Sequence, residues 1–317
     1  MKVIFLGTSG AIPTLSRNLP SVAIQRDGEI LLFDCGEYTQ IQLIKANLRI
    51  GRIENIFISH LHGDHVTGLP GILMLLNHAA RERPINIYGP PGIKQYVFTT
   101  KKILNFFAGY EINVKEISGE TIPSEVKGED YSVKSFLLDH TTFTLGFVFE
   151  ENDKSGTLDV EKTRSLGVPE GPLLKRLKNG EDIKLDDGKI VYSKDVVGES
   201  IKGRKIVYAV DTRPTKSVAE ISTGADLLIH DGMFSEELAD EANLRGHSTV
   251  IQASKIGKSA EVSKLALTHI SPRYADPRPL IDEARTIFQN SYIAYDLMEI
   301  EIPYKKVARV QGVEGSK

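Results

Sequence analysis

Short apolar runs and longer amphipathic stretches alternate along the chain, and this alternation predicts a layered α/β fold. Residues 1–60 carry short strand-like runs separated by Gly-rich turns, beginning with the apolar run in residues 1–7. Residues 66–82 and 92–108 instead place apolar side chains at helical spacing. Interleaved strands and helices of this kind favour sheets sandwiched between layers of helices.

The middle of the chain interrupts this pattern. Residues 151–204 have few apolar positions and many Gly, Lys and Asp, so they are predicted to form an insertion, called the arm below, in one domain that spans residues 1–317. Strand-like runs resume at Lys205. The helical patterns that follow cover residues 233–243, 248–257 and 277–288. A chain of 317 residues slightly exceeds the usual size of one core, so two domains are as plausible as one domain with an insertion.

Three of the apolar runs end in a residue that can bind a metal ion. These residues are His140 after the run 135–139, Asp211 after the run 205–210, and His269 after the run 264–268. Any one of them alone is more typical of a core or surface residue with ordinary partners. Strand ends that meet at one rim of a sheet bring distant side chains together, so their recurrence favours a common metal site.

The segment with the most potential metal ligands is His60-Leu61-His62-Gly63-Asp64-His65, which directly follows the apolar run 56–58. Imidazole and carboxylate groups are metal ligands, so the segment is interpreted as part of a metal site. The alternative interpretation is a polar loop that is rich in histidine and has no metal-binding role. Four ligands on such short tethers compete for the same directions around one tetrahedral ion. We therefore expect the four residues to bind two ions, with His60 and His62 facing one ion and Asp64 and His65 facing the second. Two divalent ions about 3.5–4 Å apart can clamp the oxygens of a displacement at phosphorus.

Composition narrows the class of protein. The hydrophobic content of 41% supports a substantial core, and the single cysteine, Cys35, excludes an internal disulfide. Such cysteine usage fits a reducing, cytoplasmic location. No apolar stretch approaches the roughly 18 residues needed to cross a bilayer, so no membrane association is expected. The formal net charge of −3 excludes a generally basic protein, and nucleic-acid binding must therefore rely on a local patch.

One such patch lies in the predicted arm. The segment 162–178 carries five basic residues and a single acidic one, Glu170. The basic residues are Lys162, Arg164, Lys175, Arg176 and Lys178. The same segment contains the helix-breaking and strand-breaking run 167–172. Composition alone leaves two interpretations open: a nucleic-acid contact, or a solvated loop whose charges keep it in solution.

The motifs together resemble a known family. The hexapeptide 60–65 is similar to the signature of the metallo-β-lactamase superfamily, which has an αββα sandwich fold. Neighbouring motifs narrow the resemblance to the short form of tRNase Z, an endonuclease that matures transfer-RNA 3′ ends. These motifs are Phe33-Asp34-Cys35-Gly36-Glu37, Gly171-Pro172, Gly246-His247-Ser248-Thr249 and the segment 267–274. The resemblance extends over essentially the whole chain.

The resemblance implies a set of ligands and partners. It implies two Zn²⁺ ions per chain, with Mn²⁺ or another divalent ion as an alternative. One ion is assigned to His60, His62 and His140, the other to Asp64, His65 and His269, with Asp211 bridging both. It further implies a precursor-tRNA substrate, a homodimer, and an arm that grips the tRNA elbow. The arm residues expected to bind substrate are Gly171, Pro172, Lys175, Arg176 and Lys178.

The chain departs from the family pattern at several positions. The family commonly has a Pro-x-Lys-x-Arg-Asn loop, and here Arg17 and Asn18 are kept as expected substrate-binding residues while Leu15 replaces the lysine. Tyr38 and Ile41 stand at variable places after the Asp-Cys-Gly-Glu motif. These departures put the preference for the substrate end in doubt and leave the metal site intact.

The expected proton relay involves His247, whose residue type suits proton transfer near neutral pH. His247 follows Gly246 without a preceding strand, so we predict a catalytic residue rather than a ligand; the alternative is a histidine at the start of a helix. Asp231, which replaces a family Glu, is expected to orient its imidazole, and Asp64 is the alternative proton donor. Other functions within the superfamily remain open, namely a general metallo-phosphodiesterase or a glyoxalase II-like thioester hydrolase. A non-enzymatic, metal-stabilised binding protein fits poorly, because structural zinc sites are usually closed and mononuclear.

Overall fold

The computed structural model describes residues 1–305, which divide into two compact units. The first unit comprises residues 1–150 and 205–302, and the second comprises residues 151–204 together with the chain from Pro303. No helix among the described residues is long and apolar enough to cross a membrane.

The first unit contains two mixed sheets, each with seven strands within the described residues. In order across the first sheet the strands are β16 (Glu299–Glu301), β1 (Lys2–Gly7), β2 (Ser21–Arg26), β3 (Glu29–Phe33), β4 (Ile53–Phe57), β5 (Ile85–Gly89) and β6 (Ile112–Glu116). Across the second sheet they are β15 (Ser291–Ile293), β14 (Leu265–Thr268), β13 (Leu227–Asp231), β12 (Lys205–Ala209), β9 (Thr144–Glu151), β8 (Tyr131–Leu138) and β7 (Glu125–Lys127). The strands β3 to β6 are parallel to one another, and so are β12 to β15.

Alternation along the strands separates the layers. On β1, Val3 and Phe5 join a core between the two sheets, whereas Ile4 and Leu6 join a core beneath the helices of the first sheet. Opposite faces of a strand carry alternate side chains, so one strand serves both cores. The cores of the first unit lie in three layers, which makes the unit a four-layer αββα sandwich.

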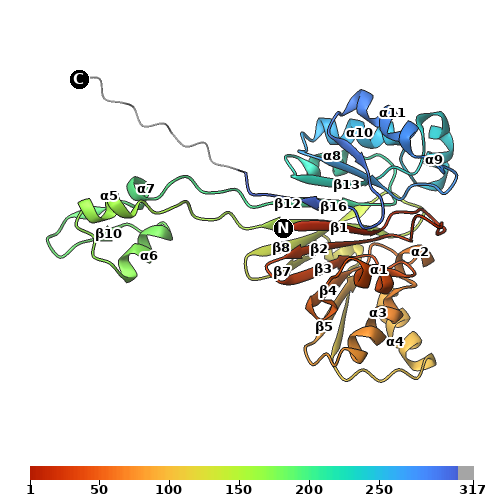
Figure 1. Ribbon diagram of the computed structural model, residues 1–317, viewed down its shortest axis with the longest axis horizontal. Helices are drawn as coiled ribbons and strands as arrows, with labels where there is room; N and C mark the ends of the chain where they lie inside the picture. Colours follow the sequence, from red (N-terminus) through yellow and green to blue (C-terminus); the bar gives the residue numbers. More distant parts are fainter. Residues whose placement is uncertain (306–317) are drawn as a thin grey trace. The chain divides into compact units, whose positions relative to one another are not determined.

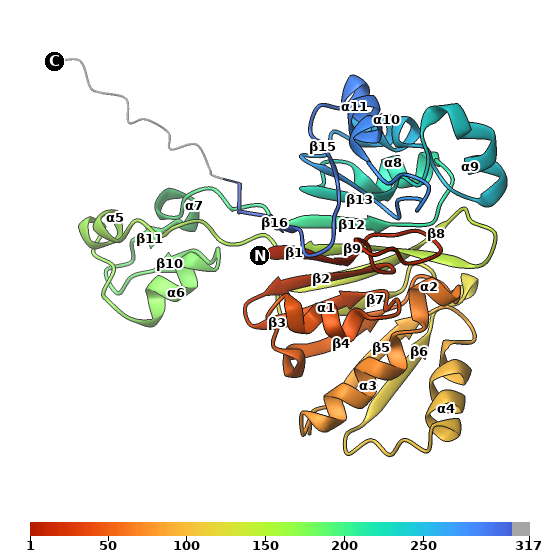
Figure 2. The same ribbon diagram turned by 45° about the vertical axis from the view of Figure 1, so that its right-hand side comes forward.

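Helices cover both outer faces of the sandwich (Figure 1). The first sheet is covered by α1 (Thr39–Lys45), α3 (Leu69–His78) and α4 (Ile93–Ile103). The second sheet is covered by α8 (Lys216–Ser222), α10 (Val250–Ser259) and α11 (Arg278–Ile287), as Figure 2 shows. Shorter helical segments are α2 (Gly63–Val66), α9 (Ala239–Arg245), η1 (Ile50–Arg52), η2 (Gly119–Thr121) and η3 (Glu236–Leu238).

The second unit is more ordered than its composition suggests. It contains α5 (Val160–Ser165), α6 (Pro172–Lys178), α7 (Ser193–Val196) and the two-stranded sheet of β10 (Ile183–Lys184) and β11 (Ile190–Val191). A small core holds Val168, Leu177, Ile183, Val191 and Val196. A few apolar positions spread over the segment therefore suffice to assemble a core of its own.

Two further expectations need correction. The helical pattern over 66–82 is divided between α2 and α3, which begins only after Gly68. Residues 1–60 are not all strands and turns, since α1 lies among them. The helices α10 and α11 and the strands that precede the ligand positions lie close to the predicted ranges, whereas α4 ends five residues before the predicted end and the range 233–243 contains η3 and only the first part of α9.

Candidate metal centre

The strands that carry the candidate ligands end in a tight backbone turn. Asp34, Asp211 and His269 follow β3, β12 and β14, and each has a positive φ, of 54°, 54° and 59° respectively. Asp and His are among the side chains that tolerate this left-handed region better than most, at some cost in strain. The turn redirects the side chain after each strand. His60 and His62 lie between β4 and α2, and Asp64 and His65 lie in α2.

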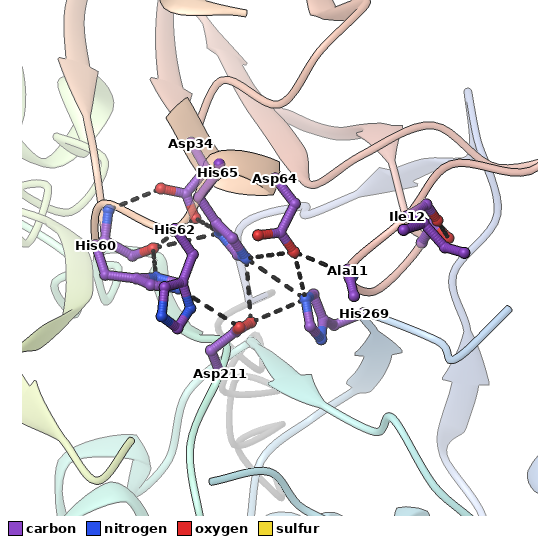
Figure 3. Close-up of polar contacts among 12 residues, drawn as sticks. Ala11, Ile12, Asp34, His60, His62, Asp64, His65, Asp211 and His269 are labelled. Atoms are coloured by element: carbon purple, nitrogen blue, oxygen red, sulfur yellow. Dashed lines mark hydrogen bonds and ion pairs between the residues drawn. The ribbon is translucent and has the colours of Figure 1, made fainter. Parts of the chain in front are cut away.

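The seven predicted ligands lie together, and Figure 3 shows six of them: His60, His62, Asp64, His65, Asp211 and His269. They form two groups of potential ligand atoms within 4.8 Å of one another: one with His60, His62, His140 and Asp211, the other with Asp64, His65 and His269. These groups match the two sets that the resemblance implies.

Asp211 lies between the two groups through its two oxygens. Its Oδ2 is 3.6 Å from His60 Nε2 and 3.8 Å from His140 Nε2. Its Oδ1 is 3.3 Å from both His65 Nε2 and His269 Nε2. Each oxygen thus faces two imidazole nitrogens from one side, which is the arrangement of a carboxylate that bridges two ions.

Asp64 completes the second group. Its Oδ2 is 3.4 Å from His269 Nε2 and 3.6 Å from His65 Nε2, and it accepts a hydrogen bond of 3.0 Å from Ala11 N (Figure 3). The Ala11 amide therefore ties the loop between β1 and β2 to a ligand. In the first group, His62 Nδ1 lies 3.4 Å from His140 Nε2.

The donor set fits a pair of divalent cations. His60 Nε2 and Asp211 Oδ1 are buried without a hydrogen-bond partner in the described part of the chain. A buried polar atom without a partner is costly, and a metal ion would satisfy both atoms. Imidazole nitrogens with carboxylate oxygens suit zinc and other first-row divalent ions.

The pKa shifts of the predicted ligands also reflect their close packing. Burial works to lower the pKa of His65, but the carboxylates of Asp211, Asp34 and Asp64 outweigh it and leave that pKa well above its usual range. The pKa of Asp211 lies well below its usual range, because His269 and His65 outweigh the opposing effect of burial. The pKa of His60 is lowered by its burial and by His65. The carboxylates at this rim therefore favour positive charge on the groups between them.

Asp34 supports the ligands from behind. Its Oδ2 lies 2.8 Å from His65 Nδ1 and accepts hydrogen bonds from Ser59 Oγ at 2.8 Å and Tyr208 Oη at 2.7 Å. Such an outer carboxylate fixes the imidazole and leaves its other nitrogen for a metal ion. Similarly, His140 Nδ1 donates to Gly246 O at 2.7 Å. Asp34 and Tyr208 were not among the predicted site residues, although Asp34 follows an apolar strand in the same way as the predicted ligands.

His247 and Asp231 form a pair beside the ligands. His247 Nδ1 lies 2.7 Å from Asp231 Oδ2, and its ring stacks on His269 with centroids 5.1 Å apart. Burial lowers the pKa of His247, but Asp231 outweighs it and raises this pKa to about 9. Asp231 is itself fixed by the amides of Thr212 and Met233. With Asp211 and His269, His247 also forms a third group of potential ligands.

The other predicted residues lie elsewhere. Arg17 is buried, and its Nη1 donates to Thr8 Oγ1 at 2.7 Å and to Ala294 O at 2.6 Å. These contacts give Arg17 an internal role in holding the loop, and its contact with substrate stays a prediction. Asn18 is half-buried. The predicted arm residues lie in the second unit, at the start of α6 and along it.

The layered fold is the metallo-β-lactamase fold, and one rim of it carries paired groups of potential metal ligands. Its fold is similar to that of YhfI from Bacillus subtilis, a metallo-β-lactamase fold protein, with a TM-score of 0.66 and 18% identity over 94% of this chain and 98% of that one. The family model for the anti-Pycsar protein Apyc1 matches residues 1–104.

The chain belongs to the ribonuclease Z family. It is 40% identical to the ribonuclease Z of Haloferax volcanii over 306 residues, which cover 96% of each chain. It is also similar to the crystal structure of human tRNase Z, short form, with a TM-score of 0.69 and 28% identity over 96% of this chain and 100% of that chain. The resemblance derived from the motifs, and the αββα fold that it implied, are confirmed.

Proposed function

We propose that this protein is the endoribonuclease that removes the 3′ trailer from precursor tRNA by phosphodiester hydrolysis and leaves a tRNA 3′-hydroxyl. The observation that carries the proposal is the pair of ligand groups joined by the two oxygens of Asp211. Membership of the ribonuclease Z family supports the substrate. We further propose that the protein acts in the cytoplasm as a homodimer, which light scattering of the purified protein would test.

We assign one ion to His60, His62 and His140, the other to Asp64, His65 and His269, and the bridge to Asp211. Zn²⁺ is the proposed metal because of the imidazole-rich set, with Mn²⁺ as the alternative. Two bound ions would activate a water molecule for attack at phosphorus and offset the charge that develops on the phosphate oxygens.

The residues of the chain supply the remaining chemistry. The departing 3′-oxygen of the tRNA needs a proton, and His247 is the proposed donor. Asp231 holds His247 Nδ1, which leaves Nε2 as the nitrogen that faces the reaction. Asp34 keeps the His65 imidazole in place through Nδ1. The basic residues on α6, Lys175, Arg176 and Lys178, are proposed to bind tRNA phosphates, together with Gly171 and Pro172 at the start of the helix.

Three substrates test the function. We expect the reconstituted enzyme to cleave a 3′-extended precursor tRNA at the 3′ end of the mature tRNA, and far more efficiently than bis(p-nitrophenyl) phosphate. A preference for the small phosphodiester would indicate a general metallo-phosphodiesterase, and hydrolysis of a glutathione thioester would indicate a glyoxalase II-like enzyme. Either result would replace the proposal.

The metal content tests the two-ion assignment. Elemental analysis of the reconstituted protein should give close to two metal ions per chain, because each ligand group offers enough donors for one ion. Saturation at one ion with full activity would exclude a mechanism with two ions.

A further inference from the structure

The chain enters and leaves the second unit through two antiparallel segments, residues 151–158 and 197–204, which form a stalk. One of the bridges between the segments joins Lys154 and Ile201, whose backbones exchange hydrogen bonds of 2.9 and 2.8 Å. A two-stranded ribbon is only marginally stable in water, so a stalk of this kind needs further support.

An ion pair holds the two segments together at the base of the stalk. Arg204 donates to Glu151 twice, from Nε to Oε2 at 2.7 Å and from Nη2 to Oε1 at 2.6 Å, and both side chains are buried. Gly203 permits this close approach, because a Cβ atom there would lie 1.9 Å from Glu151 O. A buried ion pair stabilises a fold only where further groups satisfy its remaining donors.

Tyr304, three residues after β16, provides such a group from the C-terminal segment. Its Oη accepts a hydrogen bond of 3.1 Å from Arg204 Nη2. The Arg204 guanidinium lies over the Tyr304 ring with its Cζ 4.0 Å from the centroid, and Lys154 Nζ lies over the same ring at 4.2 Å. Cation–π contacts at these distances are attractive, and more so where the cation is partly desolvated. One aromatic ring therefore binds a cation from each segment of the stalk.

We propose that the C-terminal segment belongs functionally to the substrate-binding arm, and that Tyr304 is a clip that keeps the stalk closed. Tyr304 is then a positioning residue for precursor tRNA, because it acts through the stalk and touches no substrate. The inference rests on the proposed ribonuclease function.

The consequence for tRNA binding follows from the position of the basic residues. Lys175 and Lys178 lie on α6, between the two segments of the stalk in the sequence. If the segments separate, these lysines lose their fixed placement, and binding must pay the entropy of ordering them again. The apparent Kd then rises in inverse proportion to the fraction of molecules with a closed stalk.

The first test compares two substitutions at the clip. Tyr304→Leu keeps an apolar side chain but removes the ring, whereas Tyr304→Phe keeps the ring and removes only the hydroxyl. We expect Tyr304→Leu to weaken binding of a non-cleavable precursor tRNA roughly 5- to 30-fold, the range that corresponds to the loss of two cation–π contacts. The loss should appear in Kd and KM, with kcat at saturating precursor close to that of the wild type. Tyr304→Phe should retain most of the affinity.

The matched control is Tyr292→Leu. Tyr292 lies on β15, is half-buried like Tyr304, and also makes one hydroxyl hydrogen bond of 3.1 Å, to Asn290 Oδ1. Its removal should leave the precursor affinity unchanged. In Tyr304→Leu, the slope of log affinity against log salt should equal that of the wild type, because the clip contacts no phosphate. A smaller slope would mean that this part of the stalk binds the RNA directly, and would overturn a positioning role.

The second readout does not depend on RNA. Hydrogen exchange of the backbone amides in residues 151–158 and 197–204 should be faster in Tyr304→Leu than in the wild type or Tyr304→Phe, because exchange reports local opening. Unchanged exchange in these segments, or an equal loss of affinity in the Leu and Phe variants, would overturn the clip. Faster exchange with unchanged precursor affinity would overturn its role in positioning. If the wild type binds no precursor tRNA, the proposed function fails, and hydrogen exchange still decides whether the ring holds the stalk closed.

Discussion

At the residue scale, the centre depends on a few side chains with distinct roles. Asp211 connects the two ligand groups, Asp34 fixes a ligand from behind, and His247 faces the centre without belonging to either of the two predicted ligand sets. Because these roles differ, substitutions should separate metal binding from proton transfer.

His247→Ala should lower the turnover of precursor tRNA by roughly 10²- to 10⁴-fold, the usual contribution of an acid–base group. Both metal ions should be retained, because the two predicted ligand groups remain complete. Steady-state kinetics and elemental analysis of the same preparation check both statements. Loss of a metal ion would make His247 a ligand, and an unchanged turnover would assign protonation to Asp64 or to water.

Asp34→Asn should lower metal affinity about 10- to 100-fold, as expected when the outer partner of a ligand histidine is changed. The amide keeps the size of the side chain and loses the charge that holds His65 Nδ1. Competition with a chelating dye measures the effect. Asp130→Asn is the matched control, since Asp130 pairs with Arg26 away from the ligands. Equal affinities in the two variants would contradict the role of Asp34.

The sequence predicts the ligands better than their supports. The ligands in the segment 60–65 are recognisable from the local sequence motif alone. Tyr208 lies within a strand, and its hydroxyl contacts Asp34 only after the two sheets pack together. The same holds for Ala11, which acts through a backbone amide and carries no side-chain signal. A periodic sequence pattern predicts helices and strands, but it does not predict which distant segments will contact one another.

At the scale of elements, the errors have physical causes. The helix α1 has seven residues, which is too short for a clear apolar period. The second unit has its apolar residues scattered over several short elements, so that no window of sequence shows its core. By contrast, α10 and α11 have ten residues each and were predicted close to their observed bounds.

The structure also refines the basic patch on the second unit. Arg164 pairs with Glu170, and Arg176 Nε pairs with Glu181 Oε2 at 2.8 Å. Lys175 and Lys178 are exposed on α6. Substitution of these two lysines is therefore a better test of tRNA binding by the arm than deletion of α6. Such a deletion would also remove Leu177 from the small core of the second unit.

The double variant Lys175→Gln with Lys178→Gln should weaken precursor-tRNA binding and reduce the dependence of log affinity on log salt by about one unit per lysine. The reason is that each lost phosphate contact releases one fewer counterion. Filter binding at several salt concentrations measures both effects. Lys94→Gln with Lys102→Gln makes the same charge change on α4, and an equal loss there would mean that α6 has no special role.

At the scale of the whole molecule, the metal centre joins segments that are distant in sequence. The predicted ligands come from α2 and from the ends of β4, β8, β12 and β14, so they are carried by both halves of the sandwich. A ligand that binds only the folded state stabilises it by RT ln(1 + [L]/Kd), which is about 4 kcal/mol at a thousandfold excess over Kd. Metal binding should therefore stabilise the first unit as a whole.

Removal of the metal with a chelator should lower the midpoint of thermal unfolding of the first unit by roughly 8–16 °C, and added Zn²⁺ should restore it. Asp211→Asn should abolish most of this shift, since the bridge serves both ligand groups, whereas His247→Ala should preserve it. Differential scanning calorimetry with and without the chelator provides the measurement. If the wild type shows no shift, or if His247→Ala abolishes it, the division between ligands and proton donor drawn from the geometry is wrong. If the shift persists in Asp211→Asn, the two groups bind their ions independently and the bridge has no energetic role.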